Sequence, residues 1–135
     1  MRRFIISERS MAPALTPGDC FLARRVRRPR RGTIAFFPHP RQQSLWLVKR
    51  VVGLPGETVR IVDGSVLIDG AELDEPWTTD LTMPEGLWTV GSDQMFVLSD
   101  ARQRTRADSR TLGPVPVRPA YEPWWRYRRG SGVTS

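Results

Sequence analysis

A chain of 135 residues has room for one domain with a modest hydrophobic core. Its net charge of +7 and isoelectric point near 11.1 favour polyanionic partners, namely anionic lipid, nucleic acid or acidic protein. A single cysteine excludes an intramolecular disulfide and a cysteine-rich metal site, so we expect Cys20 in the core and no metal or other cofactor.

Short apolar runs broken by 12 prolines and 11 glycines predict strands and no long helix. We expect strands over residues 4–6, 19–26, 33–37, 45–52, 57–62, 66–68 and 94–99, with Asp63-Gly64 as a hairpin turn. This pattern favours a mainly β fold in which antiparallel sheets surround one core.

The two ends of the chain differ from the middle. Nine residues precede Ser10, with Arg2 and Arg3 before three apolar residues, whereas a membrane-spanning helix needs roughly 20. We therefore expect no leader and no transmembrane anchor, and a chain that is cytoplasmic or peripheral at a membrane. We assign residues 1–120 to the domain and 121–135 to a basic aromatic tail whose last six residues are disordered.

A proline-bearing turn in SERSMAPALTPGD presents Ser10 as a candidate nucleophile, which requires a base. Lys49 is the only lysine among 21 lysines and arginines, and lysine can lose its proton whereas arginine cannot. Strand alternation places Lys49 on one face with Leu47 and Val51, where lost hydration lowers the pKa of an amine. We expect His39, between two prolines, in a surface loop outside any Ser-His arrangement.

At these residues the sequence resembles the type I signal peptidases of peptidase family S26, serine proteases that cut leader peptides with a Ser/Lys dyad. SMAPALTPGD resembles their nucleophile box, GTIAFFPHP a following strand, KRVVGLPGE the lysine box and ADSRTLGPVP the box that follows. The blocks keep the family's order from about residue 4 to residue 117. The resemblance implies a short form lacking the N-terminal transmembrane anchor, with a signal-peptidase or repressor-protease-like β fold and a minimal accessory region.

The resemblance also implies the activity and the catalytic residues. A serine endopeptidase of this kind cleaves a precursor protein or leader peptide after small residues in an Ala-X-Ala pattern. Ser10 is the implied nucleophile and its backbone N–H an oxyanion donor, with Lys49 as general base. The second oxyanion donor stays open, because Glu8 stands where many relatives carry a serine.

Further residues are implied as support for the dyad. Arg106 stands where relatives place a serine that holds the lysine, so we expect Thr105 to replace that serine. Asp108 and Arg110 are implied as an ion pair behind the dyad, with Ser109 nearby.

Shallow pockets for small residues at positions −1 and −3 are implied for seven residues. Phe36 stands where a smaller aliphatic residue is usual, which predicts a tight −3 pocket that accepts Ala or Gly over Val. The seven are Phe4, Ile6, Met11, Leu15, Phe36, Leu47 and Val48.

Three alternatives remain open. A specialised maturation protease for one precursor fits the missing anchor, and a self-cleaving repressor-type protease shares the dyad but would need a DNA-binding domain before Ser10. A non-catalytic basic β-module fits the run RRVRRPRRG and the residues Trp124, Trp125 and Tyr127, which suit packing, membrane contact or stacking on bases. Peripheral contact with an anionic membrane is the preferred extra partner over nucleic acid, because no nucleic-acid module accompanies the charge.

Overall fold

The computed structural model describes residues 1–128, which form two antiparallel sheets and one turn of helix. A seven-stranded sheet has the order β1-β2-β11-β3-β4-β9-β10, and a four-stranded sheet the order β7-β6-β5-β8. The prediction of a mainly β fold is thereby confirmed. The elements are β1 (Arg2–Ile5), β2 (Asp19–Arg25), β3 (Ile34–His39), β4 (Gln42–Gly53), β5 (Thr58–Val62), β6 (Ser65–Ile68), β7 (Ala71–Glu72), β8 (Gly86–Thr89), β9 (Gln94–Leu98), α1 (Ser109–Leu112), β10 (Val115–Pro116) and β11 (Tyr121–Arg128).

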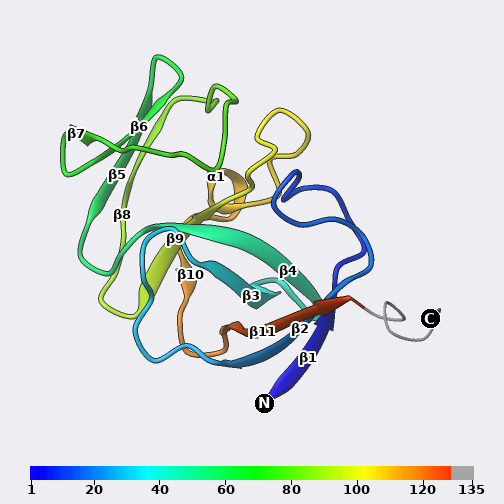
Figure 1. The fold of residues 1–135 in the computed structure, drawn as a ribbon. Coiled ribbons are helices and arrows are strands. Elements are labelled where there is room, and N and C mark those ends of the chain that lie inside the picture. Colours follow the sequence, from blue (N-terminus) through cyan, green and yellow to red (C-terminus); the bar gives the residue numbers. More distant parts are fainter. Residues whose placement is uncertain (129–135) are drawn as a thin grey trace.

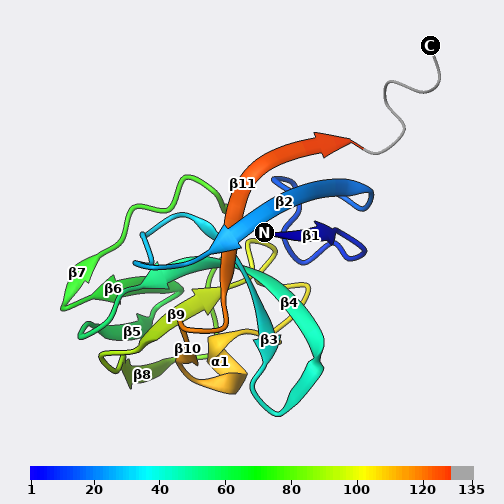
Figure 2. The ribbon, with the colours of Figure 1, turned by 90° about the horizontal axis from the view of Figure 1, so that it is seen from below.

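The four-stranded sheet lies at one end of the molecule, and the larger sheet curls across the rest (Figure 1). Viewed from below, β2 and β11 run side by side and β3 and β4 form a long hairpin (Figure 2). The expected Asp63-Gly64 turn joins β5 to β6, and both residues have positive φ, 52° and 79°, as a two-residue hairpin turn requires.

Three buried clusters fill the interior. One lies within the curl of the larger sheet, and a second joins β4 and β9 to the small sheet through residues such as Val59 and Phe96. The third lies beneath the loop that carries Ser10, where Met11 and Leu15 are fully buried. Burial of each such side chain contributes roughly 1.5–3 kcal/mol, so this cluster anchors the loop to the sheet.

The segment after residue 120 forms a strand of the larger sheet. β11 lies between β2 and β3, and Arg126 and Arg128 donate hydrogen bonds to the Asp19 carboxylate. The assignment of residues 121–128 to a tail is therefore wrong. Pro123 and a register shift next to it interrupt the alternation by which a strand is recognised. Residues 129–135, including those expected to be disordered, lie outside the described part of the chain.

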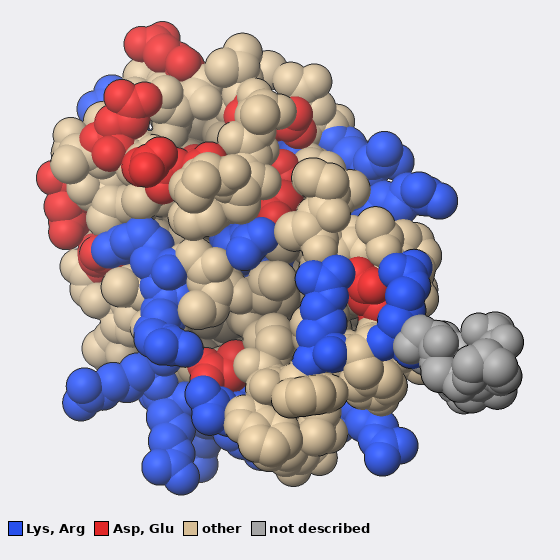
Figure 3. Space-filling view, viewed as in Figure 1, with Lys and Arg blue, Asp and Glu red and all other residues tan. Residues whose placement is uncertain are grey.

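Charge is divided between the two sheets. Eight of the 14 acidic residues fall between positions 57 and 85, where Arg60 is the single cation. Figure 3 shows the acidic side chains gathered over the small sheet and the arginines over the larger one. The arginine run contributes to a cavity of about 530 Å³ lined by Arg24, Arg25, Arg27, Arg28, Arg30 and Glu122. Within residues 1–128, no helix has the length and hydropathy needed to cross a membrane.

Candidate active site

The loop that carries Ser10 is closed at its base and fastened at its tip. Ile6 N–H donates to the Asp19 carbonyl, Gly18 N–H donates to the Ile6 carbonyl, and Ala101 N–H donates to the Ser10 carbonyl at 2.9 Å. Ser10 retains 7% exposure, so its side chain has a fixed position with only a narrow opening to solvent. In the described part of the chain, no group accepts a hydrogen bond from the Ser10 N–H.

Lys49 projects from β4 into the same cavity as Ser10. It is 3% exposed, and its Nζ donates to Ser99 Oγ at 3.0 Å. Burial lowers the pKa of Lys49, opposed by the negative charges of Asp108 and Glu8. The hydrogen-bond acceptor is a neutral hydroxyl, and among residues 1–128 no carboxylate accepts a hydrogen bond from the amine to stabilise its charged form.

The sheet register explains why Ser99 contacts the lysine. Arg50 of β4 lies opposite Leu98 of β9 in an antiparallel pair, so Lys49 and Ser99 occupy the next positions. Thr105, the partner expected from the sequence, does not contact the lysine: its hydroxyl accepts from Ala107 N–H and its carbonyl from Arg110. Ser99 was not identified as a site residue from the sequence. The feature that could have identified it is its position at the end of a strand able to pair with the strand of Lys49.

A buried network holds Ser99 in place. Asp108 is fully buried and accepts hydrogen bonds from the Ser99 N–H at 2.9 Å and from the Arg110 side chain. Asp108 also caps the short helix α1 by accepting from the Arg110 N–H. Ser109 Oγ accepts from Val97 N–H on β9, which ties the helix to the strand that leads to Ser99.

A cavity of about 290 Å³ contains Ser10 and Lys49. Met11 and Leu15, expected in the substrate pockets, lie instead in the core beneath the loop, because the loop turns their side chains inward. Trp46, Ser7 and Glu8 line the cavity and were not among the expected pocket residues. The other five expected residues line it: Phe4, Ile6, Phe36, Leu47 and Val48.

Aromatic rings that contact one another form one wall of this cavity. Phe4 stacks on Phe36 with ring centroids 4.3 Å apart, and Phe4 also contacts Trp46 at 5.2 Å. His39 does not line this cavity; it lies at the end of β3, where its Nδ1 accepts a hydrogen bond from Arg41 N–H. Among residues 1–128, no three His, Cys, Asp or Glu side chains gather into a group able to hold a metal ion.

Known proteins resemble this chain over most of its length. Residues 1–120 match the family described as signal peptidase, peptidase S26. The chain is 39% identical to signal peptidase I of Leptolyngbya laminosa over 129 residues, which cover 84% of this chain and 61% of that protein. It is 30% identical to signal peptidase I of Bacillus licheniformis, covering 83% of this chain and 68% of that protein.

Another relative and a solved structure point the same way. The mitochondrial ATP-independent inner membrane protease subunit 1b of Arabidopsis thaliana is 35% identical, over 79% of this chain and 57% of its own length. The chain thus spans between 57% and 68% of these three relatives. The crystal structure of a signal peptidase I from Enterococcus faecalis superposes with a TM-score of 0.63 at 29% identity, covering 74% of this chain and 99% of that chain. The chain belongs to the signal peptidase family, peptidase S26.

Proposed function

We propose that the protein is a serine endopeptidase that cleaves leader or signal-type peptides after small residues, with Ser10 as nucleophile and Lys49 as general base. The observation that carries this proposal is the environment of Lys49. The only lysine of the chain is buried, shares a cavity with Ser10 and donates to a neutral hydroxyl. These conditions favour the neutral amine that a base requires.

Two proton transfers connect the residues in this mechanism. Neutral Lys49 accepts the proton of the Ser10 hydroxyl while Ser10 Oγ attacks the peptide carbonyl, and the ammonium then protonates the leaving amine. Water, deprotonated by the regenerated lysine, hydrolyses the acyl-enzyme. The Ser10 N–H, which has no acceptor among residues 1–128, provides one donor to the oxyanion, and Ser99 Oγ accepts a hydrogen bond from the ammonium.

The strand edges around the cavity suit an extended peptide. β1 pairs with β2 only, and residues 46–49 of β4 pair with β3, whereas the pairing of β4 with β9 begins at Arg50. In the described part of the chain, β1 and this half of β4 therefore each keep one open edge, and both line the cavity. A substrate strand between them would gain main-chain hydrogen bonds, while the aromatic wall limits the size of its side chains.

The test measures the cleavage of leader-like peptides ending in Ala-X-Ala at pH values from 6 to 10, with mass spectrometry to identify the products. We expect cleavage after the last alanine, and its loss in Ser10→Ala and in Lys49→Arg, because arginine keeps its proton. Arg41→Lys is the matched control: it exchanges the same residue types at an exposed site outside the cavity and should leave the rate unchanged.

Each alternative gives a different result in this assay. Full cleavage by Lys49→Arg would contradict the dyad. A protein that cleaves one natural precursor but none of the Ala-X-Ala peptides would be a specialised maturation protease. A protein that cleaves nothing, with lipid and detergent also present, would favour a basic binding module, whose affinity for anionic lipid should not depend on Lys49.

A further inference from the structure

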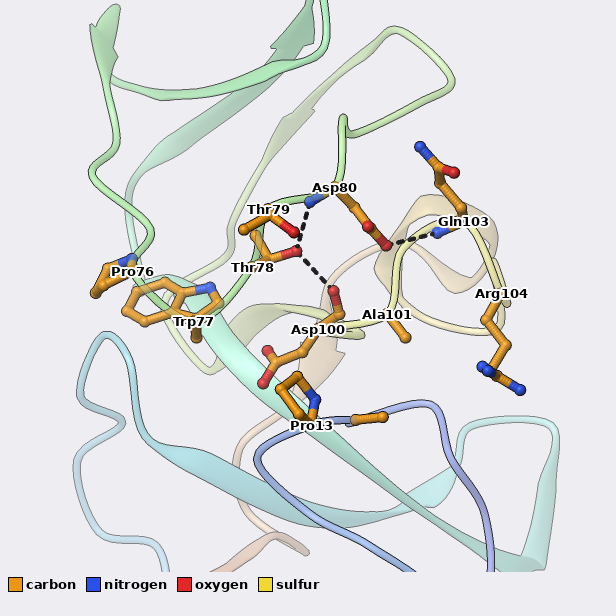
Figure 4. Close-up of a pocket in the computed structure, with 11 residues that line it drawn as sticks. Pro13, Pro76, Trp77, Thr78, Thr79, Asp80, Asp100, Ala101, Gln103 and Arg104 are labelled. Atoms are coloured by element: carbon orange, nitrogen blue, oxygen red, sulfur yellow. Dashed lines mark hydrogen bonds between the residues drawn. The ribbon is translucent and has the colours of Figure 1, made fainter.

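A second cavity, here called the downstream cavity, borders the opposite flank of the Ser10 loop. Its volume is about 570 Å³, roughly twice that of the cavity with Ser10 and Lys49, at about 290 Å³. Figure 4 shows Pro13 on one side of it, Trp77 and Asp80 on others, and Arg104 across from Trp77. Neither the Ser10–Lys49 chemistry nor the expected pockets use these residues.

The same two loops border both cavities. Residues 7, 8 and 10 of the first loop line the catalytic cavity, whereas Ala12 and Pro13 line the downstream cavity. In the second loop, Ala107 lines the catalytic cavity, whereas Ala101 and Arg104 line the downstream one. The hydrogen bond from Ala101 N–H to the Ser10 carbonyl joins the loops between the cavities. A peptide that occupies both cavities therefore crosses this joined pair of loops, one of which carries Ser10.

The distance between Ser10 and the downstream cavity determines which substrate residues can bind in that cavity. Ala12 and Pro13 follow Ser10 by two and three residues, and three extended residues span at most about 11 Å. A substrate whose scissile carbonyl lies at Ser10 Oγ covers the same distance with two to four residues beyond the cut.

The charged groups of the downstream cavity differ in whether they are already paired. Asp100 is buried and bound through both carboxylate oxygens to Arg50. Asp80 accepts a hydrogen bond from the Gln103 N–H at 3.2 Å. The Arg104 side chain, in contrast, is exposed and has no hydrogen-bond or ionic partner among residues 1–128. Asp80 likewise has no cationic partner among residues 1–128, so the two charges of this cavity that no ion pair neutralises are the negative Asp80 and the positive Arg104. Arg104 is the more exposed of the two and is the cation that an acidic side chain of a bound peptide can reach.

We propose that the downstream cavity binds the precursor residues at about positions +2 to +4 after the cleaved bond, and that Arg104 selects an acidic side chain there. This inference rests on the proposed function. Trp77 adds an apolar wall for the same segment, so the cavity recognises an extended peptide and not an isolated anion.

The experiment compares kcat/KM for peptides that share one Ala-X-Ala leader end and carry either Asp or Arg at +2, +3 or +4. We expect the wild-type protein to prefer Asp by about two- to fivefold at one of these positions, as for an exposed ion pair, and less so at high salt. Arg104→Glu should reverse the preference. Arg106→Glu is the matched control, because this arginine is exposed, lies two residues along the same loop and lines neither cavity.

The outcomes separate this inference from the function on which it rests. Cleavage that depends on Ser10 but is indifferent to residues +2 to +4 would overturn the inference and leave the proposed function intact. An equal reversal by Arg106→Glu would also overturn it, since only the net charge of the loop would then matter. The absence of any Ser10-dependent cleavage would refute both.

Discussion

Replacement of Ser99 by alanine tests whether this residue orients Lys49, the proposed general base. The hydroxyl is fully buried and accepts the hydrogen bond from Lys49 Nζ at 3.0 Å. Alanine removes the acceptor and leaves the backbone bond from Ser99 N–H to Asp108 possible, so the loop itself should keep its position. The lysine would lose its orientation and the group that stabilises its ammonium form.

The expected magnitude follows from the two protonation states. A buried hydrogen bond contributes about 0.5–1.5 kcal/mol between neutral groups and about 1.5–3 kcal/mol when one group is charged. In the proposed mechanism the amine is neutral in the ground state and charged in the transition state, so only the difference between these contributions, about 1–1.5 kcal/mol, lowers kcat, by roughly 5- to 10-fold. The substitution removes more stabilisation from the ammonium form of Lys49 than from the neutral amine, so the pKa of the lysine should fall. The onset of the pH–rate profile should therefore move to lower pH, by up to about one unit.

Cleavage rates of Ser99→Ala from pH 6 to 10 measure both effects. Ser109→Ala is a suitable control, because it removes another fully buried serine hydroxyl, one that bonds Val97 N–H and does not contact the lysine. Its stability should fall by about 1–3 kcal/mol while the pH onset stays in place. A Ser99→Ala protein with the wild-type kcat and pH onset would refute the reasoning, as would an equal shift in Ser109→Ala.

Two further predictions concern stability and specificity. Burial lowers the pKa of Lys49 below its ordinary value of 10.5, so its charged form destabilises the fold most below the folded pKa, and this penalty disappears as the pH rises through 10.5. Urea denaturation of Lys49→Met should therefore show a gain in stability that shrinks from pH 6 toward pH 10.5, and a gain that is constant with pH would contradict this. Phe36→Val should cost roughly 2–4 kcal/mol in stability and open the aromatic wall. Peptides with Val at −3 should then be cleaved nearly as fast as those with Ala, and an unchanged Val-to-Ala ratio would exclude Phe36 as the selecting residue.

Local pattern predicted most strands, but not the contacts that depend on distant parts of the chain. The lysine strand was expected over residues 45–52 and observed as β4 over Gln42–Gly53. β11 was missed because Pro123 and a bulge obscure its alternation, although its partner β2 holds it in the sheet. The contact of Lys49 with Ser99 depends on the register between β4 and β9, which no local pattern encodes. Met11 and Leu15 were placed in the pocket because sequence does not show which way a loop residue turns.

The preference for arginine around the single lysine has an electrostatic consequence. Asp108 raises the pKa of Lys49, and Arg110, bonded to that carboxylate, lowers it. Without a cation beside it, Asp108 would raise the pKa of Lys49 further and so reduce the fraction of neutral amine available to the proposed base. A lysine at position 110 would supply the charge but also a second amine able to give up its proton, whereas a guanidinium stays charged at every working pH. Arginine at this position therefore neutralises Asp108 permanently, so burial determines the protonation state of Lys49.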